Sequence, residues 1–287
     1  MEVVIADHVQ EELEKADVGG VTGRQWLLSA DAPDGLSFRL FRSHFQAGEN
    51  ARVTPRHHHG FQQIRWAESG SMNYGPGQAI EEGDLAYFPR GAYYGPQRRD
   101  HGIQVAIQFG FGPEMPGGKN NLRVHEEILE QLKTQGTVTA DRVFVDIDPQ
   151  TGAERRRDLG EVIAAKHTGK RYVIPPERYA QPILMHPKAY SYFDVAPGVE
   201  IKRLGSFYDQ QGPNGNVTIS MLRLSKGGAY RLGCDRAQVL WSSSSGLSIG
   251  GQTYPALTSI YSPRDETQAL SAMDPVEVYL VEFPRLD

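Results

Sequence analysis

Between residues 36 and 111, apolar and polar positions alternate in short runs, which is the pattern of half-buried β-strands. Glycine and proline residues separate these runs, as they do where strands are joined by tight turns. The runs that predict strands are Ser37–Phe45, Gln62–Trp66, Ser71–Tyr74, Asp84–Phe88 and Ile103–Phe109. We therefore predict an all-β unit in this part of the chain.

A helical period follows the alternating region. Apolar and partly apolar residues recur at helical spacing at Leu122, His125, Ile128, Leu129 and Leu132. Gly136 is suited to end this helix, because glycine adopts the left-handed backbone of a helix C-terminus at little cost. The charged segment 154–170 predicts a surface excursion.

The β pattern returns from Tyr190 to Phe283. The segment Val217–Leu224 alternates like the strand that ends at Phe45, and Ser259–Arg264 parallels Leu85–Arg90. These parallels indicate a weak internal duplication. We predict an N-terminal domain over residues 1–118, a helical or irregular connector over 119–186 and a second β domain over 187–287.

The composition limits the classes of function. The chain has 287 residues and a net charge of −5, with a pI near 6.0, so it lacks the basic face that nucleic-acid binding needs. It contains 31 glycines, 18 prolines and a single cysteine, Cys234. The start of the chain has no basic, apolar signal sequence, and no segment approaches the roughly 18 apolar residues of a membrane span. We expect a cytoplasmic protein that binds neither nucleic acid nor membranes.

A histidine cluster carries the strongest chemical signal. On an extended strand, His57, His59 and Gln63 point to one face, whereas His58 points to the other. Convergent neutral imidazoles are common ligands of transition metals. Since the sequence has no histidine after His186, the second β region cannot repeat this site.

These residues resemble the two sequence motifs of the cupin superfamily. The first motif matches at Gly48, His57, His59, Gln63 and Gly70. The second matches at Gly83, Pro89 and Gly91, with Tyr94 and Arg98 where the family has histidine and asparagine. The resemblance implies a bicupin, with two double-stranded β-helix barrels of which the first is functional and the second degenerate.

The resemblance also implies a divalent transition metal, with Fe(II) as first choice and Zn, Mn or Ni as alternatives. Its ligands would be His57, His59, Gln63 and Tyr94, although His101 is an alternative to Tyr94. Glutamine in place of the usual glutamate removes one negative charge from the ligand set, which makes the metal a stronger Lewis acid.

Arg65 lies two residues after Gln63 and is therefore expected to point to the same face as the histidine cluster. Its guanidinium could capture a carboxylate or enolate inside the barrel, or it could pair with Glu68 or Asp84 at the sheet edge. Together with Tyr94 it is our candidate for a catalytic role.

Three functions remain open from the sequence. The first is dioxygenase-type oxidation of a small enolic, phenolic or carboxylate substrate. The second is Lewis-acid isomerisation, cyclisation or elimination, with Tyr94 in proton transfer. The third is small-molecule binding without catalysis. In each case the partner is a small molecule, and the resemblance further implies a homodimer.

Overall fold

The computed structural model describes residues 1–15, 20–31, 36–46, 48, 51–110, 120–208 and 215–285, with the side chains of residues 15 and 120–123 excluded. The boundary predicted at residue 118 and the side chain of Leu122 lie outside this description. No helix in the described ranges is long and apolar enough to cross a membrane. The chain forms two compact units, one of residues 12–184 and one of residues 1–11 with 185–287.

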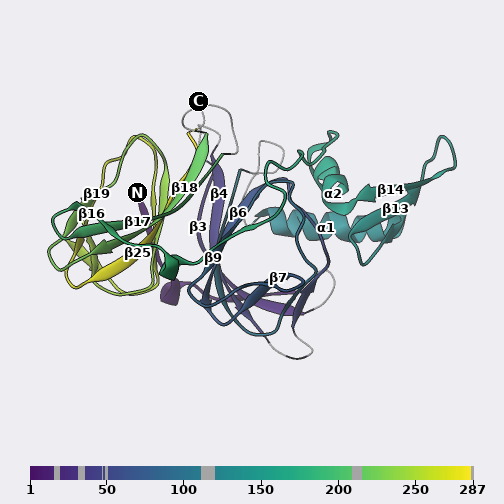
Figure 1. The fold of residues 1–287 in the computed structure, drawn as a ribbon. Coiled ribbons are helices and arrows are strands. Elements are labelled where there is room, and N and C mark those ends of the chain that lie inside the picture. The colour runs from purple at the N-terminus through teal and green to yellow at the C-terminus, as the bar shows by residue number, and fades with distance from the viewer. Residues whose placement is uncertain are drawn as a thin grey trace. The chain divides into compact units, whose positions relative to one another are not determined.

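The unit of residues 12–184, here unit 2, is built on a seven-stranded sheet in the order β15-β9-β6-β11-β4-β3-β2. Two two-stranded sheets, β10-β5 and β7-β8, also belong to this unit, of which β3, β4, β6, β7 and β9 are labelled in Figure 1. The strands are β2 (Glu12–Lys15), β3 (Val21–Asp31), β4 (Ser37–Phe45), β5 (Arg52–Thr54), β6 (Gln62–Ser69), β7 (Met72–Gly75), β8 (Gln78–Ile80), β9 (Leu85–Phe88), β10 (Gln97–Arg99), β11 (Gly102–Phe109) and β15 (Ile183–Met185). The five strands predicted in this region are all present, within three residues at each end.

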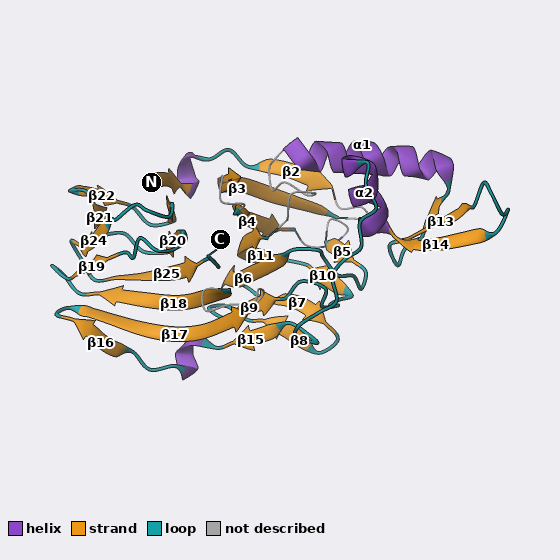
Figure 2. Cartoon of the chain, turned by 90° about the horizontal axis from the view of Figure 1, so that it is seen from above, coloured by secondary structure: helices purple, strands orange, loops and turns teal. Residues whose placement is uncertain are grey.

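The helical part of unit 2 has an apolar core of its own. Helix α1 (Asn120–Gln135) ends where Gly136 predicts, and α2 (Leu159–Thr168) packs beside it (Figure 2). Their core consists of Ile128, Leu129, Leu132, Phe144, Leu159, Val162 and Ile163. A three-stranded sheet, β12 (Thr137–Val138), β13 (Val143–Ile147) and β14 (Glu154–Asp158), joins the two helices. The charged segment 154–170, predicted as a surface excursion, forms β14 and α2, and α2 buries Leu159, Val162 and Ile163.

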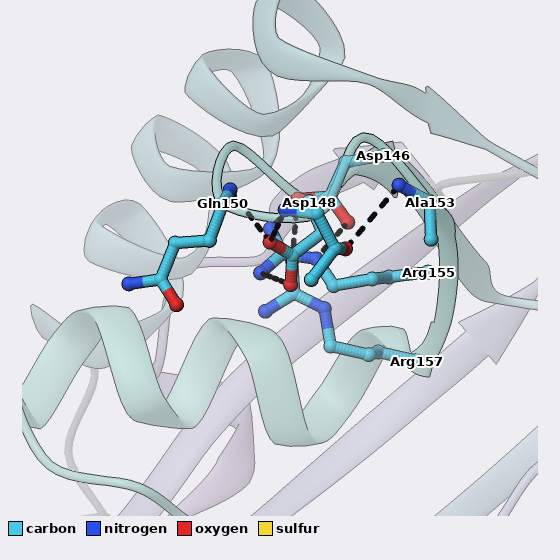
Figure 3. Close-up of polar contacts among 7 residues, drawn as sticks. Asp146, Asp148, Gln150, Ala153, Arg155 and Arg157 are labelled. Carbon is cyan, nitrogen blue, oxygen red and sulfur yellow. Dashed lines mark hydrogen bonds and ion pairs between the residues drawn. The ribbon is translucent and has the colours of Figure 1, made fainter.

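Charged side chains hold the β13–β14 hairpin together (Figure 3). The Asp146 carboxylate accepts from Arg155 at 2.5 Å and from Arg157 at 2.8 Å. Asp148 closes the turn by accepting from the backbone N–H of Gln150 at 2.8 Å. The arginines of this charged segment thus pair across a hairpin, and the base of that hairpin carries Arg142 and Asp158.

The other unit, here unit 1, contains a seven-stranded sheet in the order β1-β23-β20-β25-β18-β17-β16 and a four-stranded sheet, β19-β24-β21-β22. Its elements are β1 (Glu2–Ile5), two 3-10 turns (Ala6–His8 and Pro187–Ala189), β16 (Phe193–Ala196), β17 (Val199–Tyr208), β18 (Asn216–Leu224), β19 (Ala229–Arg231), β20 (Gln238–Ser242), β21 (Leu247–Ile249), β22 (Gln252–Tyr254), β23 (Thr258–Ser262), β24 (Ala269–Ala272) and β25 (Val276–Glu282).

The interior of unit 1 is filled with aliphatic side chains. Leu222, Leu240, Ile260 and Leu280 are fully buried in one cluster. The first strand of the chain, β1, pairs with β23 and therefore belongs to this unit, although the sequence-based boundaries place it in the N-terminal domain. The fold of the whole chain is all-β with a helical insertion, as predicted.

Candidate functional site

A cavity of about 680 Å³ lies in unit 2. This volume suits a small organic ligand. Strands β2 to β6, β10 and β11, together with the loop of residues 57–61, supply most of its wall, and residues between 125 and 174 supply the rest. The residues that line it and enter the argument are Glu12, Glu14, Arg24, Trp26, Arg39, Phe41, Ser43, Phe45, Arg52, His57, His58, His59, Phe61, Gln63, Arg65, Arg99, Gln104, Gln108, Glu126, Arg142, Asp158 and Tyr172.

His57 and His59 reach the cavity from a loop and not from a regular strand. Strand β5 ends at Thr54, since Pro55 has no N–H for a further ladder bond, and β6 begins only at Gln62. A single antiparallel bridge to Tyr94 keeps His57 extended, with N···O distances of 3.0 Å in both directions. The prediction of a continuous strand is wrong here, but the two imidazoles still meet, with ring centres 4.9 Å apart.

Both imidazoles are neutral at neutral pH. Burial, together with the charges of Arg142, Arg65 and Arg99, lowers the pKa of His57 to about 3. Burial and the neighbouring His57 lower the pKa of His59 well below its usual value. The Nδ1 of His57 lies 2.7 Å from the Pro55 carbonyl oxygen. Because a carbonyl only accepts, Nδ1 carries the proton and Nε2 keeps a lone pair.

Gln63 and Arg65 lie side by side on β6, both buried and both on the cavity wall. The Oε1 of Gln63 accepts from Arg65 Nε at 3.1 Å, from Arg65 Nη2 at 2.7 Å and from Gln108 Nε2 at 2.9 Å. Gln108 sits directly opposite Gln63 on β11, and it in turn accepts from Arg39 at 2.6 Å. A hydrogen-bonded row thus crosses β4, β11 and β6.

Tyr94 contacts this row through its hydroxyl but is not among the described residues that line the cavity. Its hydroxyl accepts from Gln63 Nε2 at 2.8 Å and from Arg65 Nη2 at 2.9 Å. Its ring packs on His57, with centres 4.4 Å apart. Tyr94 therefore connects the imidazoles to the Gln63–Arg65 pair, while its catalytic role stays a prediction.

Of the two other histidines considered from the sequence, His58 lines the cavity but faces Asp158, and His101 lies outside the cavity. His58 stacks on Tyr93 at 4.1 Å between ring centres, and its Nε2 lies 3.4 Å from an oxygen of Asp158. His101 is exposed in the turn before β11 and does not line the cavity.

Guanidinium groups dominate the charge of the cavity. Among the described lining residues, six are arginines and four are carboxylates. Burial lowers the pKa of Arg24 to about 9 and of Arg39 to about 10, although Glu14 opposes both shifts. Burial and the charges of Arg65 and Arg52 lower the pKa of Arg99 well below its usual value. The cavity therefore contains more positive charge than its own carboxylates neutralise.

Aromatic rings hold several of these arginines in place. The guanidinium of Arg24 lies 4.5 Å from the ring centre of Phe41, and that of Arg99 lies 4.9 Å from that of Phe45. Cation–π contacts of this kind fix a charged group without neutralising it.

Within the described residues, the wall also carries buried polar atoms that have no hydrogen-bond partner. They are Arg24 Nε, Ser43 Oγ, Arg65 Nη1, Arg99 Nε and Gln104 Oε1. Buried polar groups are normally paired, so a concentration of unpaired ones around one cavity points to a polar ligand or to ordered water.

The donor set fits a divalent metal at only two of the four predicted positions. His57 and His59 suit it, since they are neutral and convergent. The oxygens of Gln63 and Tyr94 do not, because the cationic Arg65 is hydrogen-bonded to both. Among the described residues, no group of three or more histidine, cysteine or carboxylate side chains is arranged to hold a metal. The residues present therefore do not fit the four-ligand site.

No protein-family model matches the chain, and no curated protein sequence matches it. Solved structures do. A candidate dioxygenase from Nostoc punctiforme aligns over 99% of this chain and 83% of its own, at a TM-score of 0.60 and 11% identity.

Two other structures match over 99% of this chain and 76% of their own. Oxalate decarboxylase from Bacillus subtilis does so at a TM-score of 0.54 and 12% identity. HEPD from Streptomyces albus, with 2-hydroxyethylphosphonate and Fe(II) bound, does so at 0.55 and 13%. At these identities the similarity establishes the fold. The chain has the cupin fold.

Sequence reasoning placed Arg65 inside the barrel but missed the other arginines of the lining. The signal was present in part, because Arg39, Phe41, Ser43 and Phe45 alternate on one face of β4 and all line the cavity. No such pattern pointed to Arg142, because it lies outside the predicted strands. In the structure its backbone has a φ of +60°. A non-glycine residue in this region is strained, and such strain is frequent at functional sites.

Proposed function

We propose that the protein is a cupin enzyme that binds a small organic acid in the cavity of unit 2. Guanidinium groups would hold the acidic group of the ligand, and aromatic rings would hold the remainder. The observation that carries the proposal is the cluster of buried and partly buried arginines, several of them stacked on rings, that outnumber the carboxylates of the described cavity wall.

Electrostatics supports an anionic ligand. Burial is the main cause of the lowered pKa values of Arg24 and Arg99, and the charges of neighbouring guanidinium groups lower both further. A carboxylate in the cavity would relieve this repulsion and pair with the guanidinium fork. A neutral ligand of the same shape would do neither.

The cavity wall also favours a ligand with an apolar or aromatic body. Trp26, Phe41, Phe61 and Tyr172 share the wall with the arginines. Such a mixture of rings and convergent polar groups is typical of small-molecule sites.

The structural neighbours agree with this ligand class. One is named for oxalate, a small dianion, and another holds 2-hydroxyethylphosphonate. Both ligands are small and anionic, as the charge of this cavity requires.

Calorimetric titration tests the proposal. Benzoate, malonate and phenylphosphonate are titrated into the protein, with benzamide as the neutral counterpart of benzoate. At least one acid should bind, and benzamide should bind far more weakly. Arg99→Met should weaken acid binding about 10- to 100-fold, since a hydrogen bond to a charged group contributes about 1.5–3 kcal/mol.

A matched control is Arg231→Met, because Arg231 is an exposed arginine of unit 1. It removes the same charge and should leave acid binding unchanged. Equal binding of benzoate and benzamide, or equal effects of the two variants, would contradict the proposal.

Metal-dependent oxidation is the second candidate. The two neutral, convergent imidazoles favour it, as does the likeness to a candidate dioxygenase. Fe(II), or another divalent metal, would be held by His57 and His59. Oxygen uptake by protein loaded with Fe(II), in the presence of the acid that binds, tests this reaction. Anaerobic turnover would favour the isomerase or lyase alternative.

A further inference from the structure

We infer that Arg65 is an internal cation that competes with divalent metals for the oxygens of Gln63 and Tyr94. One nitrogen of its guanidinium, Nη2, donates both to Gln63 Oε1 at 2.7 Å and to the Tyr94 hydroxyl at 2.9 Å. A metal held by His57 and His59 can recruit Gln63 only if this guanidinium gives up its hydrogen bond.

The competition is strong because the Gln63 oxygen is saturated. Three N–H groups, two from Arg65 and one from Gln108, point at an oxygen that has two lone pairs. The Gln63 amide cannot simply turn round, since its Nε2 already donates to Tyr94. Arg65 is 6% exposed, so water does little to screen its charge from an incoming cation.

The inference has a consequence for ligand binding, and this part rests on the proposed function. A carboxylate that pairs with Arg65 draws the guanidinium away from Gln63 and Tyr94. The acid and the metal should then favour each other's binding. Thermodynamic linkage requires that each raises the affinity of the other by the same factor.

Cobalt(II) titration, followed by calorimetry and by the visible spectrum of the bound ion, tests the competition in the full-length protein. Arg65→Met removes the charge and the donors while it keeps the length of the side chain. We expect this variant to bind Co(II) at least tenfold more tightly than the wild type. The added Gln63→Leu substitution should abolish that gain.

Arg99→Met is the matched control, because it removes one buried charge from the same cavity without touching Gln63 or Tyr94. A general loss of positive charge would strengthen Co(II) binding equally in both variants, and this outcome would overturn the inference. Unchanged Co(II) affinity in Arg65→Met would do so too. Arg65→Gln serves as a second neutral variant if the methionine variant does not fold, as judged by circular dichroism.

The linkage is tested with benzoate, a weak chelator of Co(II) in solution. Saturating benzoate should tighten Co(II) binding to the wild type and leave Arg65→Met unchanged. Benzoate that binds without altering Co(II) affinity would contradict the linkage. If no acid in the panel binds, the proposed function fails, while the comparison of Arg65→Met with Arg99→Met still decides the competition.

Discussion

At the scale of single residues, Gln63 shows why an amide suits this site better than the glutamate of the cupin motif. An amide has a donor and an acceptor, and Gln63 uses both, since it accepts from Arg65 and donates to Tyr94. A carboxylate could form the first contact but not the second. The glutamine therefore follows from its two neighbours, Arg65 on its own strand and Tyr94 in the facing loop.

Removal of the Tyr94 hydroxyl should cost stability, since Gln63 Nε2 and Arg65 Nη2 would lose a buried acceptor. We expect Tyr94→Phe to lower the free energy of unfolding by about 1–3 kcal/mol, as measured by urea denaturation. The neighbouring Tyr93→Phe should change it by less than about 0.5 kcal/mol, because Tyr93 is 43% exposed. Similar losses in both variants would argue against the hydrogen-bonded arrangement.

At the scale of elements, Asp158 joins the histidine loop to the helical part of unit 2. One oxygen of Asp158 caps α2 by accepting from the Glu161 N–H at 3.0 Å, and the other faces His58. Burial alone would lower the pKa of His58, but the Asp158 carboxylate, with smaller contributions from the Gly91 carbonyl and Glu161, raises it. The same pair keeps the pKa of Asp158 below its usual value, although burial opposes this.

Stability from this ion pair should therefore depend on pH. Because the pKa of His58 is higher in the folded state, its contribution to the free energy of unfolding is complete below the pKa of the unfolded state, about 6.5. The contribution is lost as the pH rises through the pKa of the folded state. Asp158→Asn removes the pair but keeps the helix cap, since asparagine caps as well as aspartate. We expect the wild type to exceed this variant by up to about 1 kcal/mol at pH 6 and by less at pH 9, in urea unfolding. A difference that is constant between these pH values would contradict the pairing.

The elements differ in how far the sequence predicted them. Alternation predicted β4 and β11 almost to the residue. In each of these strands, residues of one face line the cavity, and the other face is largely buried. Alternation failed for β14, whose sequence Glu154–Asp158 is charged throughout, since the strand is stabilised by ion pairs to Asp146 and not by burial. It also failed for His57, where a single bridge to Tyr94 replaces a strand. Local pattern does not encode such long-range pairs.

At the scale of the whole molecule, the two units each contain a seven-stranded sheet and differ in what fills them. Unit 2 has arginines, glutamines and imidazoles around a cavity, whereas the described interior of unit 1 is a cluster of aliphatic side chains. The absence of histidine after His186 predicted only that the second β region cannot repeat the histidine site. What this region has instead is an apolar cluster that includes Leu222, Leu240 and Leu280. The predicted homodimer stays a prediction, which sedimentation velocity tests.

This division predicts that stability and ligand binding can be separated. Leu240→Ala should lower the free energy of unfolding by about 2–5 kcal/mol, because it leaves a cavity in a fully packed core. The dissociation constant for the bound acid, measured below the melting temperature, should stay at the wild-type value, since every residue that lines the ligand cavity belongs to unit 2. Arg99→Met should show the opposite behaviour, with a large loss of affinity and a small change in stability. A Leu240→Ala protein that is folded but binds the acid tenfold more weakly would mean that unit 1 also shapes the site.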